Sequence, residues 1–123
     1  MSIVFIHSRL AYTAVFFSIA MALWGIWRYI RKQGIDSSYW GALYICGGLV
    51  LVQVVLGTII WLSGAGHLGE QTIHILYGAV AVLVIPGVFI YTRGEERRRN
   101  AAIYGLAFIF LAGILIRAIM TAP

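Results

Sequence analysis

The stretch QVVLGTIIWLSGAGHLGEQTIHILYG, from Gln53 to Gly78, sets the organisation of this chain. It contains the end of one apolar segment, a short polar connection and the start of a second apolar segment. On each side a small residue follows a polar one by four positions, Gly57 after Gln53 and Gly78 after His74, so each pair shares one helix face. Facing each other across a helical hairpin, these pairs outline a pocket.

Composition places the chain in a membrane. Of its 123 residues, 62% are hydrophobic and 11% are charged, and the mean hydropathy is +0.94, whereas soluble domains carry roughly 25% charged residues. Four apolar stretches can each cross a hydrocarbon core of about 30 Å as a helix: residues 3–27, 39–62, 71–91 and 101–120. They predict an all-α fold, a four-helix transmembrane up-down bundle, with residues 1–123 as one domain.

The basic residues predict the orientation of the bundle. Seven of the nine lie between segments 1 and 2 or between segments 3 and 4: Arg28, Arg31, Lys32, Arg93, Arg97, Arg98 and Arg99. Because Lys and Arg resist translocation, both loops should be cytoplasmic, with both termini and the connection around His67 outside. Arg9 and Arg117 fall toward the outer face. The Arg97–Arg99 run is then a topology anchor on anionic lipid, and we expect no nucleic-acid partner.

The cytoplasmic ends of the segments carry turn, cap and anchor signals. Gly34 is expected to end the first helix, and Asp36, Ser37 or Ser38 to cap the second. Aromatic side chains near these ends predict an interfacial belt: Trp24, Trp27, Tyr29, Tyr39, Trp40 and Tyr44.

Two histidines are expected at one depth. His7 and His74 each lie near the outer start of a segment, and Ala11 follows His7 as Gly78 follows His74. Segments 1 and 3 are diagonal in an up-down bundle. Two such imidazoles could bind both axial positions of a haem iron, with Ala11 and Gly78 clearing space for the porphyrin. Alternatively, each histidine hydrogen-bonds to a neighbouring helix or to interfacial water.

Other candidate pocket residues have alternative roles. Gln53 and Gly57 share a face that either receives the ligand or packs against a helix. Arg117 is either a snorkelling interface residue or the counter-ion of a haem propionate. Arg9, two residues after His7, should point away from the pocket. His67 lies in a glycine-rich connection and is expected to be solvated.

Three motifs together resemble one half of haem A synthase over roughly residues 4–92: His7-Ser-Arg9, Gln53-Val-Val-Leu-Gly-Thr58 and His74-Ile-Leu76. The resemblance implies a four-helix half with a histidine pair from alternate helices. The chain holds only one half, Val4 stands where the family has a glutamate, and the outer connection lacks the cysteine pair of many members. The resemblance therefore carries over the scaffold and the ligation by His7 and His74, without the family's oxidation chemistry.

Two other functional classes include membrane proteins of this kind. Small four-helix exchangers bury a carboxylate, but all four acids of this chain lie in connections: Asp36, Glu70, Glu95 and Glu96. A cofactor-free structural subunit of a respiratory or photosynthetic complex, with a pocket for lipid, quinone or pigment, remains the alternative, because the chain has almost no extramembrane mass to meet a soluble partner.

The sequence thus predicts a multi-pass protein of the cell inner membrane that binds one haem b per chain near the outer face. We expect it to serve electron transfer or quinol-linked redox as a small subunit of a larger membrane complex, with no catalytic activity of its own. Its expected partners are membrane lipid and other membrane subunits, with a quinone as a further candidate. The pocket residues are His7 and His74 as iron ligands, and Ala11, Gln53, Gly57, Gly78 and Arg117 around the cofactor.

The orientation can be tested with a reporter that is active only in the cytoplasm. Fused between Arg31 and Ile35 or at Glu95 it should be active, and at either terminus it should be silent, because the basic loops stay inside. The reverse activity pattern would put the histidines on the cytoplasmic side.

Overall fold

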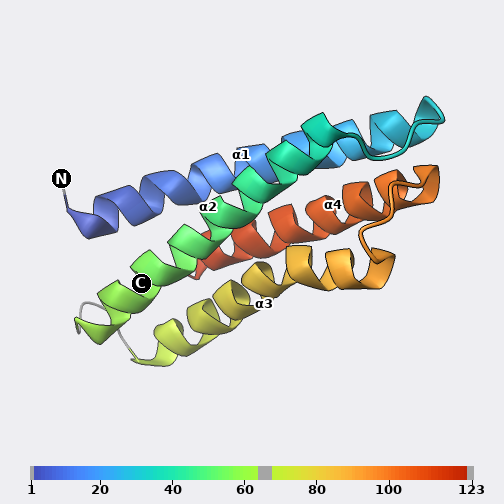
Figure 1. The fold of residues 1–123 in the computed structure, drawn as a ribbon. Coiled ribbons are helices and arrows are strands. Elements are labelled where there is room, and N and C mark those ends of the chain that lie inside the picture. Colours follow the sequence, from blue (N-terminus) through green and yellow to red (C-terminus); the bar gives the residue numbers. More distant parts are fainter. Residues whose placement is uncertain (1, 64–67, 122–123) are drawn as a thin grey trace.

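A computed structural model of the chain describes residues 2–63 and 68–121, which form helices and connections and contain no strand. The four helices are α1 (Ile3–Ile30), α2 (Ser37–Leu62), α3 (Leu68–Thr92) and α4 (Arg98–Met120). Successive helices are antiparallel, so α1 begins and α4 ends at the same end of the molecule (Figure 1). All four are long and apolar enough to cross a membrane. The predicted all-α up-down bundle is confirmed, with helices that extend up to three residues beyond the expected bounds.

The helices form a ring of neighbours. Within the described residues, α1 packs against α2 and α4, and α3 packs against the same two helices. The backbones of α1 and α3 make no close contact there, so these two helices are diagonal, as expected. The closest pairing is that of α1 with α4, and both α2 and α3 are held less closely than these two. Of the described α3 side chains, only Ala81 and Thr92 are buried.

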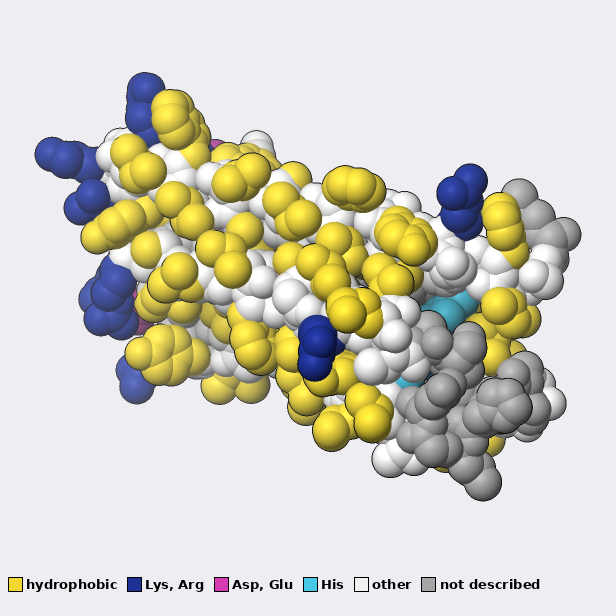
Figure 2. All heavy atoms as spheres, turned by 180° about the vertical axis from the view of Figure 1, so that it is seen from behind, with side chains coloured by type: hydrophobic (Ala, Val, Ile, Leu, Met, Phe, Trp, Pro, Cys, Tyr) yellow, Lys and Arg dark blue, Asp and Glu magenta, His cyan; other side chains and the backbone are white. Residues whose placement is uncertain are grey.

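The surface of the bundle is that of a membrane protein. Large apolar side chains are exposed on every helix, among them Phe16, Leu62, Ile90 and Leu106, and their natural environment is the lipid hydrocarbon. Lys and Arg side chains gather mainly at one end of this apolar surface (Figure 2). We call that end, with the connections after α1 and α3, the arginine-rich end. The opposite end, where α1 and α3 begin, is the histidine end.

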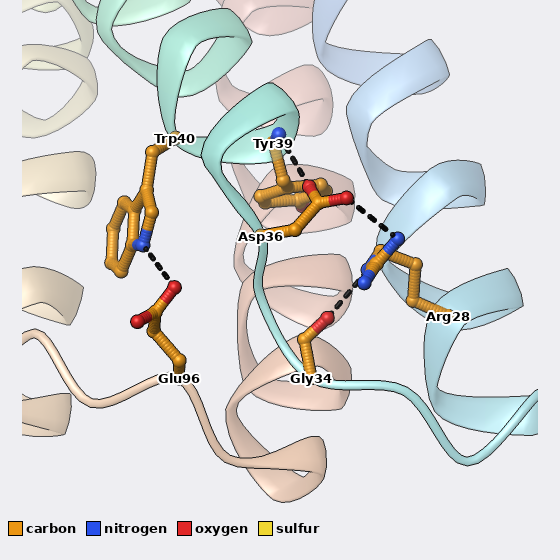
Figure 3. Close-up of polar contacts among 6 residues, drawn as sticks. All are labelled: Arg28, Gly34, Asp36, Tyr39, Trp40 and Glu96. Atoms are coloured by element: carbon orange, nitrogen blue, oxygen red, sulfur yellow. Dashed lines mark hydrogen bonds and ion pairs between the residues drawn. The ribbon is translucent and has the colours of Figure 1, made fainter.

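At the arginine-rich end, polar contacts tie the two connections to α1 and α2 (Figure 3). Arg28 of α1 donates a hydrogen bond to the Gly34 carbonyl and forms an ion pair with Asp36, 3.2 Å between Nη1 and Oδ2. Trp40 of α2 donates its indole N–H to the Glu96 carboxylate at 3.3 Å. These contacts join α1, α2 and the connection before α4, so this end of the bundle is closed.

The residues that end α1 and start α2 differ in part from the expectation. Asp36 caps α2 as predicted, since its side chain accepts from the Tyr39 backbone N–H at 2.9 Å. Gly34 does not end α1. Lys32 takes the left-handed conformation after the helix, with φ of 59°. Gly34 is required for a different reason, because a Cβ there would clash with the Glu96 carbonyl oxygen.

An aromatic core fills the half of the bundle nearest the arginine-rich end. Tyr39 is fully buried, its hydroxyl donates to the Met21 carbonyl at 3.1 Å, and its ring lies 5.0 Å from that of Trp24. Tyr39 is therefore not part of the interfacial belt in which we expected it. Its burial follows from the hydrogen bond, which satisfies the hydroxyl inside the bundle. Tyr104 and Phe108 of α4 pack on the same ring.

Two glycines allow the close approach of α1 and α4. A Cβ on Gly25 would lie 2.9 Å from the Ala101 carbonyl oxygen and 2.9 Å from the Gly105 nitrogen, both backbone atoms. A Cβ on Gly105 would lie 3.0 Å from the Ile26 nitrogen. Small residues that bring backbones together are the usual means of helix association in lipid. The α1–α4 pair is thus the tightest part of the bundle because each helix carries a glycine at the crossing.

Gly25→Ala should destabilise the protein even though alanine favours helix. The added methyl group meets backbone atoms that cannot rotate away, and overpacking of this kind costs about 1–3 kcal/mol. Thermal unfolding of the purified protein in detergent should show a lower midpoint than wild type. The matched control is Gly48→Ala in α2, where a Cβ meets nothing within 4 Å and helix propensity alone should leave stability equal or slightly higher. Equal midpoints for the two variants would contradict the proposed crossing.

Candidate functional site

The first side chain of the site, His74, is oriented by the end of a neighbouring helix. It lies in the early part of α3, and its Nδ1 is 2.8 Å from the carbonyl oxygen of Ala118 in the last turn of α4. Carbonyls in the last turn of a helix have no partner within the helix, so they are free to accept from a side chain. Because a carbonyl can only accept, Nδ1 carries the proton. The neutral imidazole then has its lone pair on Nε2.

The second side chain, His7, comes from the start of α1 and lies against α2. A Cβ added to Gly57 would be 3.3 Å from His7 Cε1 and 3.6 Å from Nε2, so the absence of a side chain at Gly57 makes room for this edge of the ring. One turn earlier in α2, Gln53 donates its side-chain N–H to the backbone carbonyl of His7 at 2.9 Å. The position of His7 is therefore set by two residues of α2 at a spacing of four.

The two imidazoles lie close together although their helices are diagonal. Their ring centroids are 6.1 Å apart, and the ring planes are inclined at 82°. Two rings bound to opposite sides of one metal ion through bonds of about 2 Å have centroids roughly 6 Å apart. The separation of His7 and His74 is thus compatible with one shared ion.

Both rings line a cavity of about 460 Å³ that all four helices enclose. This volume is within the range of small-molecule and cofactor sites, as is its lining of mostly apolar side chains with a few polar groups. The polar side chains of the lining are His7, Ser8, Gln53, Thr58 and His74. The cavity could therefore hold a largely apolar ligand that is fixed by a few directed contacts.

The cavity is partly open at the histidine end. In Figure 1, α4 stops short of the other three helices at the histidine end, and its last turns contribute Leu115, Ala118 and Ile119 to the lining. Figure 2 shows histidine side chains at the surface there, between apolar ones. Both His7 and His74 are partly exposed rather than buried. A ligand could therefore enter beside the end of α4 without passing through the closed arginine-rich end.

The structure brings six of the seven expected pocket residues together. The cavity lining contains His7, Ala11, Gln53, Gly57, His74 and Gly78. Arg117 does not line it. It is exposed, and in a helix its direction differs by about 200° from that of Leu115, which does line the cavity. Arg9 also points away, with its guanidinium 5.4 Å from the centre of the Phe5 ring. The expectation for His67 lies outside the described residues.

Several lining residues were not predicted from the sequence. The Ala118 carbonyl orients His74. Because every residue has a backbone carbonyl, the residue type gives no sign of this contact. Tyr12 and Trp61 contribute aromatic rings to the wall, and neither has a spacing that distinguishes it from other lipid-facing aromatics. Thr58 follows Gly57 directly, and its hydroxyl is already bonded to the Val54 carbonyl at 2.8 Å. Thr58 therefore offers the cavity an acceptor rather than a free donor.

A second hollow is a poorer candidate. It has a volume of about 490 Å³ and lies between α3 and α4, lined by residues such as Leu83, Gly87, Ile103 and Phe110. No histidine, amide or charged side chain lines it. Such a surface can contact a lipid chain or another helix, but it has no group to coordinate a metal. The histidine cavity is therefore the candidate functional site.

The described residues contain no group of three or more His, Cys, Asp and Glu side chains that could hold a metal ion. Comparison with family models, with curated proteins and with solved structures finds no match to this chain. The assignment of a function therefore depends on the geometry of the cavity and on the chemistry of its residues.

Proposed function

We propose that the chain is a multi-pass protein of the cell inner membrane that binds one haem b through His7 and His74 near the outer face. The observation that carries this proposal is the pair of imidazoles at 6.1 Å from centroid to centroid across one cavity. A haem would bring four ligand nitrogens of its own, so His7 and His74 would be the only two ligands needed from the chain. Two side chains suffice where a protein-only metal site needs three or four.

The residues present fit this group. The Ala118 carbonyl holds the proton of His74 on Nδ1, which leaves Nε2 available as a ligand. Ala11, Gly57 and Gly78 keep the walls next to the histidines free of bulky side chains. A Cβ on Gly78 would have its nearest neighbour, a Val54 methyl group, at 4.0 Å, so the wall is open at that point. Porphyrin faces need such flat, apolar surfaces.

When bound, a haem supplies reversible one-electron chemistry. This chain's own part is to present two neutral imidazoles, to orient them from α2 and α4, and to surround the group with apolar side chains that limit access of water. We propose electron transfer or quinol-linked redox as the role, without catalytic activity of the chain itself. The opening at the histidine end would put the group within reach of a partner in the membrane, for which a quinone is one candidate.

We further propose that the chain is a small subunit of a larger membrane complex. The exposed face of α3 supports this view, since among its described residues only Ala81 and Thr92 are buried. A cofactor-free structural subunit with lipid, quinone or pigment in the cavity is the second candidate. It is favoured by the same exposed face and by the second hollow beside it.

Ligation can be tested by replacing each histidine. His7→Ala and His74→Ala should each abolish the low-spin absorption spectrum of the purified, haem-loaded protein, because a six-coordinate iron loses one axial ligand. His67→Ala removes the third histidine of the chain and should leave the reduced-minus-oxidised spectrum unchanged. An unaltered low-spin spectrum in either pocket variant would exclude the bis-histidine assignment. Wild type without bound haem after reconstitution would favour the structural subunit.

The shape of the pocket can be tested with Gly78→Leu. The leucine side chain would fill space next to His74, so the ratio of haem to folded protein should fall sharply while insertion is preserved, since leucine is favourable in a spanning helix. Gly87→Leu is the matched control, because it lies on the same helix and a Cβ there meets nothing within 4 Å. Haem occupancy equal to wild type in Gly78→Leu would show that no porphyrin lies against this wall.

A further inference from the structure

Two unpartnered atoms of the cavity belong to neighbouring residues. Among the described residues, the buried side-chain nitrogen and oxygen atoms without a hydrogen-bond partner are His7 Nδ1 and Gln53 Oε1. The two side chains lie on α1 and α2, and both line the histidine cavity. The Gln53 amide lies beside His7, because its Nε2 is 2.9 Å from the His7 backbone carbonyl oxygen. An unpaired polar atom inside a membrane protein is costly, so two complementary ones at one place call for an explanation.

The orientation of Gln53 is fixed by its first hydrogen bond. Its Nε2 donates to the His7 backbone carbonyl at 2.9 Å, and because a carbonyl can only accept, the amide cannot be turned the other way round. Oε1 is then the acceptor that remains. The side chain is only 8% exposed, so water has little access to satisfy this oxygen.

The His7 ring, in turn, needs a hydrogen-bond acceptor. A neutral imidazole carries one N–H, and a metal ligand must have its lone pair on the nitrogen that faces the metal. The Cε1–Nε2 edge of His7 lies in the space that Gly57 leaves free. With Nε2 as the ligand nitrogen, the proton must be on Nδ1, which needs an acceptor. Gln53 Oε1 is the acceptor that is available.

We propose that Gln53 is the positioning residue of His7, holding it through Oε1 as acceptor for Nδ1–H and through Nε2 as donor to the His7 carbonyl. This inference rests on the proposed function for the identity of the ligand, but the hydrogen bond concerns the chain alone. It gives His7 the same tautomer that the Ala118 carbonyl gives His74. Outer-shell acceptors of this kind fix the ring and raise its basicity as a ligand.

The spacing of four between Gln53 and Gly57 then has one explanation, which is that both residues act on the His7 ring. Four residues apart on α2, they face the same side, so one holds the Nδ1 edge of His7 while the other leaves room for the Cε1–Nε2 edge. The two histidines nevertheless differ in one respect. A side chain orients His7, whereas a backbone carbonyl orients His74, so only the first acceptor can be removed by substitution.

The test is the tautomer of each histidine in the protein without haem, read from ¹⁵N chemical shifts of histidine-labelled protein in nanodiscs at a pH where both rings are neutral. In wild type, His7 and His74 should both carry the proton on Nδ1. In Gln53→Leu, His7 should lose this preference and His74 should keep it, which also reports that the variant is folded. Gln53→Glu retains an acceptor and should keep Nδ1 of His7 protonated. An unchanged His7 tautomer in Gln53→Leu would overturn the inference.

Haem titration separates this inference from the proposed function. If both hold, Gln53→Leu should bind haem about 10- to 100-fold more weakly than wild type, the usual loss for an outer-shell partner, and Gln53→Glu should recover most of the affinity. Wild type that binds no haem would overturn the proposed function, while the tautomer measurement would still decide the role of Gln53. Wild type that binds haem, with equal affinity in Gln53→Leu, would overturn the positioning role alone.

Discussion

The close approach of α1 and α4 at Gly25 and Gly105 is the contact on which the rest of the bundle depends. In a bilayer, apolar side chains gain little by leaving lipid for a helix interface, so backbone proximity and directed polar contacts must hold helices together. Both are concentrated toward the arginine-rich end, where Arg28 binds the connection after α1 and Glu96 of the connection after α3 binds α2. With that end closed and filled by aromatic rings, the cavity that all four helices line is at the histidine end.

The polar atoms at the histidine end form a consistent set. His74 is bonded to a helix-end carbonyl, and Gln53 is bonded to the backbone of His7. Among the described residues, the buried side-chain nitrogen and oxygen atoms without a partner are His7 Nδ1 and Gln53 Oε1, on adjacent helices. Ordinary helix packing would not require two imidazoles with their rings at 6.1 Å beside a cavity of about 460 Å³. A flat ligand with a central metal accounts for the rings, the cavity and the small residues together, which is the reason for preferring haem.

Much of this arrangement could be predicted from the sequence because a membrane leaves few choices. Apolar length fixed the four helices, short connections made neighbours antiparallel, and a spacing of four put Gln53 with Gly57 and His74 with Gly78 on shared faces. The failures have local causes. Of the two roles predicted for Arg117, the one beside the pocket depended on depth alone, without its direction around α4. Gly34 was interpreted as a helix end because a contact with Glu96, sixty-two residues away, leaves no local pattern. The Ala118 carbonyl is backbone and could not be predicted.

Because few of the described α3 side chains are buried, a bound cofactor would also stabilise the position of this helix. This helix supplies His74, yet few of its described side chains are buried, and its backbone makes no close contact with α1. A ligand held by His7 and His74 would link α1 to α3, two diagonal helices that are otherwise not in close backbone contact. Its binding free energy would add directly to the stability of α3. Packing of α3 onto the other helices and binding of the cofactor would then be one cooperative event.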